Sequence, residues 1–409
     1  MDKEEFYAQA RTDRSGPIDG LRVIECTTTW AGPMAGCVLA DLGADVVKIE
    51  LPEGEISRAI APFLPGTSLS FVHETVNRNK RCLTLDLRTP EGRELFLSVA
   101  ATADVVLENF LPGTLSRWGV GYEDVRDVKA DIVYVSISGW GQYGPWSSRV
   151  GYDPIVQAAS GVMAINGDPE RRNPSRTPTW LADDLAGVHA ALAALAALRH
   201  RDATGEGQRV DVSMLDTLLF QSNGYLTLGA VGVDLEPWGA ALQFCVPGNA
   251  YRCADGRYVY TGALLNSHWT RLCELMGRPE LADAPGFRDN TERVANREVV
   301  DGLVASWCAT QQSAELAALL QAEGLAATRV NEYRDLPGEP HIDERDMLVD
   351  IELADGTTAP LTGPAAKFSR TPTTIRRPAP ALGQHSAEVL AEVGVSAERY
   401  EQLRLDGVV

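Results

Sequence analysis

Two adjacent carboxylates, Asp183 and Asp184, open a predicted helix directly after the apolar segment 177–181. Acids in a first turn usually complement the helix dipole and cap free amides, which is a structural role. The same helix-start amides could also stabilise a carboxylate that acts as a nucleophile, and the oxyanion formed when it reacts. The structural role is the more common one, and the spacing of the two acids does not decide between them.

Two other segments, 77–81 and 108–119, concentrate groups that could hold an anionic ligand. These segments concentrate positive charge in a chain of formal net charge −19. The cations are Arg78, Lys80, Arg81 and Arg117. Phe110 and Trp118 could offer a face to an adenine or an apolar wall to a pantetheine arm. Solvated turns beside strands explain the composition equally well, so only the combination favours a ligand site.

A third candidate is the loop TrpAlaGlyProMetAlaGly at 30–36, which follows the first predicted strand. Doubly wound folds bind phosphate at this place, and Glu50 ends the second strand about 20 residues on, as a ribose-binding acid would. The loop is not GxGxxG, however, and Pro33 is expected at the first position of a helix without any ligand. NAD binding is therefore not predicted; a structural turn or another nucleotide ligand is favoured.

Other chemistries lack their signatures. The six histidines show neither HExxH nor any other ligand spacing, and no GxSxG elbow is present, so neither a metal site nor a Ser-His-Asp hydrolase is predicted. Tyr152 and Asp153, within 149–153, are interpreted as part of a surface turn. The seven cysteines are never spaced as CxxC and are expected to be reduced, mostly buried thiols.

The elements that must position these residues form an α/β pattern. Apolar runs predict strands at 22–26, 45–50, 82–87, 104–108, 132–138 and 209–213, and helices at 32–42, 90–101 and 185–200. The first two strands and the helix between them make a βαβ unit, which implies a parallel pair. The sequence therefore predicts a doubly wound α/β sheet, that is, a large Rossmann-like domain.

The pattern of predicted secondary structure changes beyond about residue 215. A hairpin signal at Asp255-Gly256 is followed by polar helices through Gly324, which predicts a smaller α+β domain. The segment from about residue 348 is predicted to contain a strand pair around Asp355-Gly356, a Pro-rich stretch at 370–382 and a helix near 387–393. The boundaries expected are 1–215 for the first part of the large domain, 216–345 for the small domain and 346–409 for the last segment.

Charge and composition exclude several partners. A net charge of −19 opposes binding to nucleic acid or to an anionic membrane. The amino terminus is acidic where a signal peptide would be basic and then apolar, and no apolar run is expected to approach the roughly 18 residues of a membrane span. A cytoplasmic protein is the default expectation.

Taken in order, several motifs resemble the class III (CaiB/BaiF-type) CoA-transferases, a family that also contains the α-methylacyl-CoA racemases. The matching runs are GlyLeuArgValIleGlu (20–25), AlaGlyPro (31–33), GlyAlaAspValValLysIleGlu (43–50), AsnLysArg with LeuAspLeu (79–87), GluAsnPhe (108–110), AspxxxGly (183–187), GlyGlnArgValAspValSer (207–213) and ProAlaLeuGlyGlnHis (380–385). No single run is diagnostic. Eight in the family's order, spanning nearly the whole chain, make the resemblance strong.

The resemblance implies that Asp183 is the nucleophile and Asp184 an incidental neighbour. It places along the CoA site the residues Trp30, Ala31, Lys48, Asn79, Lys80, Asn109, Phe110 and Arg117. It also implies an interlocked homodimer, with the carboxyl-terminal segment returning to the large domain. CoA and acyl-CoA would be substrates, with no permanently bound cofactor.

The residue type suits this chemistry. An aspartate can attack a thioester to give a mixed anhydride and a CoA thiolate, and the thiolate can then capture the aspartyl carbonyl as an enzyme-CoA thioester. An acceptor acid then repeats the sequence in reverse.

Three positions depart from the family pattern. Leu51 stands where an Arg often helps to hold the nucleotide. Tyr152 stands where the racemases carry a His, and Tyr is a poor base near pH 7, which favours transfer over the rival racemase. The stretch 236–243 has a single Gly where formyl and oxalyl transferases carry a glycine-rich loop. Trp238 and Leu242 there suggest a bulkier or more apolar acyl group. A non-catalytic CoA-binding protein is the remaining alternative.

Overall fold

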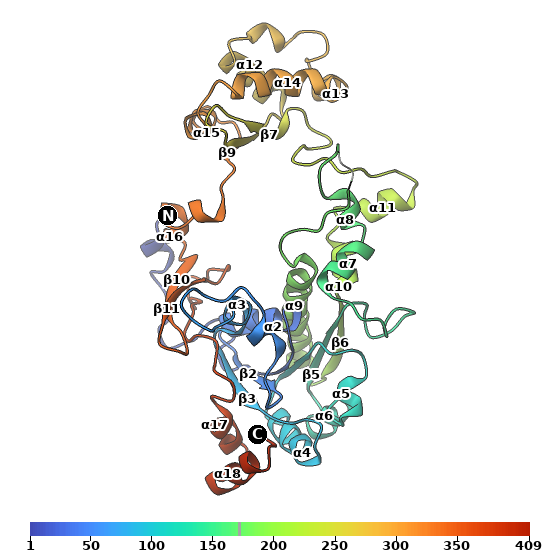
Figure 1. Cartoon of the computed structure of the whole chain (residues 1–409), viewed down its shortest axis with the longest axis vertical. Helices are drawn as coiled ribbons and strands as arrows, with labels where there is room; N and C mark the ends of the chain where they lie inside the picture. The colour runs from blue at the N-terminus through green and yellow to red at the C-terminus, as the bar shows by residue number, and fades with distance from the viewer. Residues whose placement is uncertain (171–172) are drawn as a thin grey trace. The chain divides into compact units, whose positions relative to one another are not determined.

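The computed structural model describes residues 1–170 and 173–409 (Figure 1). The chain divides into two units. The larger comprises Met1–Met163, Arg176–Asp234 and Pro340–Val409, and the smaller comprises Ala164–Ser175 and Leu235–Glu339. The chain thus leaves the larger unit after Asp234 and returns at Pro340, whereas the sequence predicted 215 and 346. The short segment that begins at Ala164 was not anticipated.

A six-stranded parallel sheet forms the centre of the larger unit. Its strands are β1 (Arg22–Cys26), β2 (Asp45–Glu50), β3 (Lys80–Thr84), β4 (Val105–Glu108), β5 (Val133–Ser138) and β6 (Gln208–Ser213), in the order β3-β2-β1-β4-β5-β6. The mixed α/β architecture with a parallel sheet is as predicted. The bounds of β3 differ from the predicted 82–87, because its register with β2 pairs Glu50 with Thr84 and β2 ends there.

Both faces of the sheet are buried, as near-continuous apolar strands require. Alternate residues such as Val23 and Val105 pack beneath α2 (Ala31–Asp41), α9 (Leu181–Thr204) and α10 (Met214–Phe220). Their neighbours, such as Ile24 and Val106, pack on the other face against α4 (Pro90–Ala100), α6 (Tyr122–Val128), α17 (Ser386–Glu392) and α18 (Ala397–Leu405). Helix α18 was not predicted.

Helix α9 is the one described helix that is long and apolar enough to cross a membrane by length and composition. The sequence predicted no such run. Its apolarity comes largely from alanines that pack against α2 and the sheet, and 44% of its most apolar window is buried inside the protein. Gly187 makes this approach possible, because a Cβ there would lie 2.7 Å from Met34 Cγ and 2.9 Å from the Ala31 carbonyl oxygen.

The last segment of the chain completes the edge of the sheet beside β3. The His385 amide donates to the Cys82 carbonyl at 2.9 Å, and the Thr84 amide donates to Ser386 Oγ at 3.1 Å. Earlier in this segment an antiparallel pair, β10 (Leu348–Glu352) and β11 (Thr358–Thr362), surrounds the predicted Asp355-Gly356 turn. Edge strands covered in this way are protected from pairing with other chains.

Shorter helices and turns connect these elements. They are α1 (Lys3–Phe6), η1 (Ile56–Ala59), α3 (Phe71–Asn77), α5 (Thr114–Arg117), α7 (Asp153–Ala159), α8 (Val162–Ile165), α11 (Tyr225–Ala230) and α16 (Pro340–Glu344).

The smaller unit has its own sheet and core. Strands β7 (Gly248–Arg252), β8 (Tyr258–Gly262) and β9 (Ala327–Arg329) are antiparallel, and the predicted Asp255-Gly256 turn joins the first two. Its helical segments are α12 (Asn266–Leu275), η2 (Pro279–Leu281), α13 (Asn290–Ala295), α14 (Arg297–Cys308), α15 (Ser313–Ala322) and η3 (Tyr333–Asp335). Trp269 is fully buried at the centre of this core. All seven cysteines of the chain are buried and free, as predicted.

Candidate active site

A cleft of about 470 Å³ opens in the larger unit where the sheet order reverses. Strands β1 and β4 are neighbours in the sheet, although β2 and β3 lie between them in sequence, so the loops that follow β1 and β4 diverge. Ligands of doubly wound folds bind at such a point. The cleft is lined by Thr28–Ala31, Ile56, Asn109–Pro112, Thr114, Ile137–Trp140, Ser147, Arg149–Pro154, Trp180, Asp183 and Met214.

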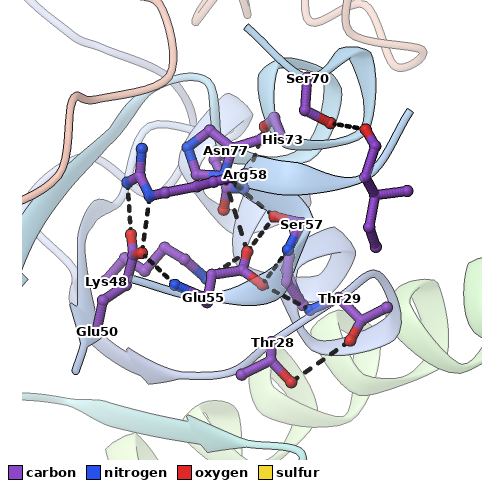
Figure 2. Close-up of polar contacts among 12 residues, drawn as sticks. Thr28, Thr29, Lys48, Glu50, Glu55, Ser57, Arg58, Ser70, His73 and Asn77 are labelled. Carbon is purple, nitrogen blue, oxygen red and sulfur yellow. Dashed lines mark hydrogen bonds and ion pairs between the residues drawn. The ribbon is translucent and has the colours of Figure 1, made fainter. Parts of the chain in front are cut away.

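The loop after β1 is held in place by side chains from two directions. The Asn109 side chain accepts from the Thr28 amide at 2.9 Å and donates to the Thr28 carbonyl at 2.8 Å. Thr29 has a φ of +69°, which is costly for a residue with a Cβ. Its amide donates to Glu55 Oε2 at 3.1 Å (Figure 2). These bonds fix the strained turn that presents Trp30 to the cleft.

A buried ion network lies beneath that loop. Glu25 is fully buried between two lysines, with Lys48 Nζ at 3.2 Å and Lys80 Nζ at 2.7 Å from its carboxylate oxygens. Lys48 Nζ also lies 3.7 Å from Glu55. Burial alone would lower the pKa of Lys48, but the surrounding glutamates raise it, so the ammonium stays charged. Gly36 leaves room for Glu25, because a Cβ there would lie 1.7 Å from Glu25 Oε2.

The network continues through η1 and α3, as Figure 2 shows. Glu55 accepts from the amide and the hydroxyl of Ser57, and the Ser57 hydroxyl lies 3.1 Å from His73 Nδ1. Burial lowers the pKa of His73, so its ring is neutral at pH 7. Arg58 binds Glu50 through two nitrogens at 2.6 and 2.8 Å. These groups partner one another and form a scaffold behind the cleft.

Three carboxylates gather at the start of α9. Asp184 accepts a hydrogen bond from Trp30 Nε1 at 2.6 Å. Asp153, from α7, accepts from the Ala182 amide and from Gln157 Nε2, both at 2.8 Å. It therefore caps α9, whose own N-cap residue, Trp180, makes no side-chain capping bond. The capping role that the sequence offered to Asp183 and Asp184 thus belongs to Asp153, which was interpreted as part of a surface turn.

Asp183 is the carboxylate of this group that faces the cleft without a partner. Among the described residues, none donates a hydrogen bond to its side chain and no cation pairs with it. Burial, followed by repulsion from Asp153 and Asp184, raises the pKa of Asp183 to about 8. A desolvated carboxylate whose charged form is this unfavourable is a stronger nucleophile than a hydrated one, once it has lost its proton.

Six of the residues predicted for the site come together in the cleft: Trp30, Ala31, Asn109, Phe110, Tyr152 and Asp183. Trp30 packs edge to face with Trp180, with ring centroids 4.6 Å apart, and Phe110 packs against Trp118 at 5.5 Å. Pro33 is the third residue of α2 rather than the first, a position where its missing N–H leaves no helical bond unmade.

The other predicted CoA residues lie away from the cleft lining. Lys48 and Lys80 belong to the buried ion network, and Arg78 and Arg81 also pair with acids. Asn79 has a φ of +64° and its side chain holds Asp41 and the backbone of Arg376. Arg117 is exposed and bonds Thr114, and Trp238 lies in the smaller unit beneath Arg297. Contact of Lys48, Asn79, Lys80 and Arg117 with CoA, and of Trp238 with substrate, stays a prediction.

Comparison with known proteins agrees with this geometry. Residues 18–386 match the family model described as CoA-transferase family III. A succinate–glutarate CoA-transferase of Agrobacterium fabrum is 36% identical over 392 residues, covering 93% of this chain and 96% of that protein. A succinyl-CoA:mesaconate CoA-transferase of Haloarcula hispanica is 37% identical over 391 residues, covering 93% and 97%.

Solved structures give the same result. A CaiB/BaiF family protein from Brucella suis superposes with a TM-score of 0.82 at 33% identity, covering 93% of this chain and all of that one. A protein from Mycobacterium tuberculosis also superposes with a TM-score of 0.82 at 33% identity, covering 91% and 99%. The family model, the relatives and the structures agree over most of the chain, and the protein belongs to CoA-transferase family III and transfers CoA.

Proposed function

We propose that the transfer runs through covalent intermediates on Asp183. The observation that carries this proposal is the contrast among the three carboxylates at the start of α9. Asp153 and Asp184 are engaged by donors from α9, α7 and the loop after β1, whereas Asp183 lines the cleft with no donor from the described residues. Only Asp183 is therefore free to form a new bond.

Over the proposed steps no proton is consumed or released. The Asp183 carboxylate attacks the thioester carbonyl, and the C–S bond breaks to give an aspartyl anhydride and a CoA thiolate. The thiolate attacks the aspartyl carbonyl, which releases the first acid as a carboxylate and leaves an aspartyl-CoA thioester. The acceptor carboxylate attacks this thioester, and its C–S bond breaks to give a second anhydride and the CoA thiolate. The thiolate then attacks the acceptor's acyl carbon, giving the new acyl-CoA and free Asp183.

The acid is proposed to be a small dicarboxylic acid. The relatives are named for succinate, glutarate, malate, citramalate and mesaconate, each of which has two carboxyl groups. This differs from the bulkier, more apolar acyl group suggested by Trp238 and Leu242. Transfer is favoured over racemisation, because these relatives are named as CoA-transferases and Tyr152 stands where the racemases carry a His.

A second copy of the chain is the proposed partner. Helices α9, α10 and α11 carry exposed apolar side chains, namely Val188, Leu192, Phe220, Leu226 and Leu228. Exposed apolar residues gathered on neighbouring elements mark association surfaces. We therefore expect a homodimer, interlocked as the resemblance implied, acting in the cytoplasm without a permanently bound cofactor. Sedimentation analysis that found only a monomer would contradict this proposal.

Mass spectrometry of the intact protein tests the covalent mechanism. Incubation with succinyl-CoA or glutaryl-CoA should add a CoA-sized mass, and hydroxylamine should convert the adduct to a hydroxamate that peptide mapping locates at Asp183. Asp183→Asn should give no adduct. Asp184→Asn is the matched control, since its amide oxygen can still accept from Trp30, and it should keep the adduct. An adduct on another residue, or its persistence in Asp183→Asn, would overturn the assignment.

A further inference from the structure

The loop 139–151, between β5 and α7, forms one wall of the cleft and is closed at its base. A Cβ added to Gly139 would lie only 2.8 Å from Gly151 Cα, so the two ends of the loop touch. The Gln142 amide donates to Asp211 Oδ2 at 2.8 Å, and the Leu215 amide donates to the Gly139 carbonyl at 3.2 Å. The loop is therefore anchored to β6 and to α10.

Aromatic packing inside this loop positions one arginine. Trp140 and Trp146 pack edge to face with centroids 5.4 Å apart, and Trp140 Nε1 donates to the Val150 carbonyl at 3.3 Å. The Arg149 guanidinium lies over the Trp146 ring, 4.8 Å from its centroid, and the Arg149 amide donates to the Trp146 carbonyl at 2.9 Å. Stacking on an aromatic face holds an arginine ready to bind an anion with little loss of freedom.

Arg149 also brings positive charge to the cleft. Among the described residues that line it, Arg149 is the only Lys or Arg, and Asp153 and Asp183 are the only acids. Within the part of the chain that the structure describes, no carboxylate forms an ion pair with Arg149. An anion that enters the cleft of this acidic protein therefore finds one free charged partner there.

We propose that Arg149 binds the second carboxylate of a dicarboxylic substrate while the first reacts at Asp183. The inference rests on the proposed covalent function and adds a specificity-determining residue to it. A carboxylate that binds beside Trp140 and Tyr152 gives up part of its hydration and is stabilised by a charged partner. A guanidinium can satisfy both carboxylate oxygens at once. A monocarboxylic acid of equal length would leave Arg149 without a partner and gain nothing from it.

Binding of two matched thioesters tests this inference separately from turnover. Glutaryl-CoA and valeryl-CoA have acyl chains of equal length and differ in the terminal carboxylate. Their Kd values would be measured by calorimetry in an Asp183→Asn background, so that neither thioester is consumed. Arg149→Met should raise the Kd of glutaryl-CoA about tenfold or more and change the Kd of valeryl-CoA by less than about twofold. Arg149→Lys should recover part of the loss. Arg126→Met is the matched control, since Arg126 also stacks on an aromatic ring but lies outside the cleft, and it should change neither Kd.

Two results would overturn the inference. Equal weakening of both thioesters by Arg149→Met would show that Arg149 binds CoA itself, for example a phosphate. No weakening of either would show that it binds neither part. Failure of the covalent mechanism would look different: the chain with Asp183 restored would form no adduct, while the dependence of glutaryl-CoA binding on Arg149 persisted.

Discussion

Two groups of carboxylates lie near the same edge of the parallel sheet, and the chain surrounds them in opposite ways. Glu25 has a lysine on each side and is fully buried. Asp183 has two other acids nearby, and no cation among the described residues pairs with it. The first environment pairs an acid with cations and fixes a structure, whereas the second raises the pKa of Asp183 and makes a reactive group. The comparison shows that neighbours, not residue type, decide which acid is reactive.

The two regions are also connected. Glu55 joins the ion network to the amide of Thr29, in the loop that presents Trp30 to Asp184. The buried ion network thus supports the loop that contacts the carboxylates at the start of α9. Interactions that hold reactive groups on a rigid support preserve their geometry during the reaction. Mutations in the buried ion network should therefore lower the stability of the fold, whereas mutations at Asp183 should lower activity.

The largest effect is expected at Asp183. Asp183→Asn keeps the shape of the side chain but removes the nucleophile, so kcat should fall about 10⁴-fold or more, equivalent to roughly 5.5 kcal/mol of activation free energy. Steady-state assays of CoA transfer to glutarate would measure this. Thermal unfolding should show that the variant remains folded. Residual activity within tenfold of the unmodified protein would exclude Asp183 as the nucleophile.

At Glu25 we expect a large loss of stability rather than a loss of the nucleophile. Glu25→Gln leaves Lys80 buried without a carboxylate, and removal of one partner from a buried ion network costs about 3–5 kcal/mol. Urea denaturation would measure the free energy of unfolding. Glu53→Gln is the control, because Glu53 pairs with Arg88 at the exposed surface, where the loss should stay below about 1 kcal/mol. Equal losses in the two variants would show that the network does not stabilise the fold.

A smaller change is expected at the contact between α9 and α2. Gly187→Ala places a methyl group 2.7 Å from Met34 Cγ and 2.9 Å from the Ala31 carbonyl oxygen. Overpacking of this kind costs about 1–3 kcal/mol and should displace the start of α9 from the cleft. We expect kcat to fall together with stability. Gly302→Ala, with nothing within 4 Å of its added Cβ, is the control and should be neutral or slightly stabilising.

The smallest change is a shift in pH dependence. Asp183 must lose its proton to attack, and its pKa is raised to about 8, so kcat/KM should rise with pH and level off above about pH 8. Asp153→Asn removes one source of repulsion but keeps an oxygen to accept from Ala182. The apparent pKa of the rate profile should then fall by up to about one unit. A profile that is unchanged, or shifted to higher pH, would contradict the role given to Asp153.

Local patterns predicted much of the fold. The bounds of β1 and β2 match the predicted strands, because short apolar runs flanked by polar residues carry that information within a few positions. The order of the strands and helix α18 were not predicted. Helix α18 has weak sequence periodicity and is held by a few buried contacts such as Leu403.

The site was predicted only in part. The resemblance to the family assigned Asp183 and the loops after β1 and β4 to the site, and the structure brings them together in one cleft. The β1–β2 register pairs Glu25 directly with Lys48, a pattern that could have predicted the buried ion pair, and contact of Lys48 and Lys80 with CoA stays a prediction. Asp153 and Arg149 were passed over, because their partners in the structure depend on how the loop after β5 folds.

The pairing of Cys82 with His385 joins residues 303 positions apart. During synthesis at about 5–20 residues per second, β3 would emerge from the ribosome about 15–60 seconds before the segment that covers it. The edge of β3 therefore stays uncovered while the smaller unit is synthesised. During this period, neighbouring nascent chains can pair with that edge. We expect chains that stop before residue 370 to aggregate, which light scattering would detect. We also expect the nascent full-length chain to depend on chaperones during that interval.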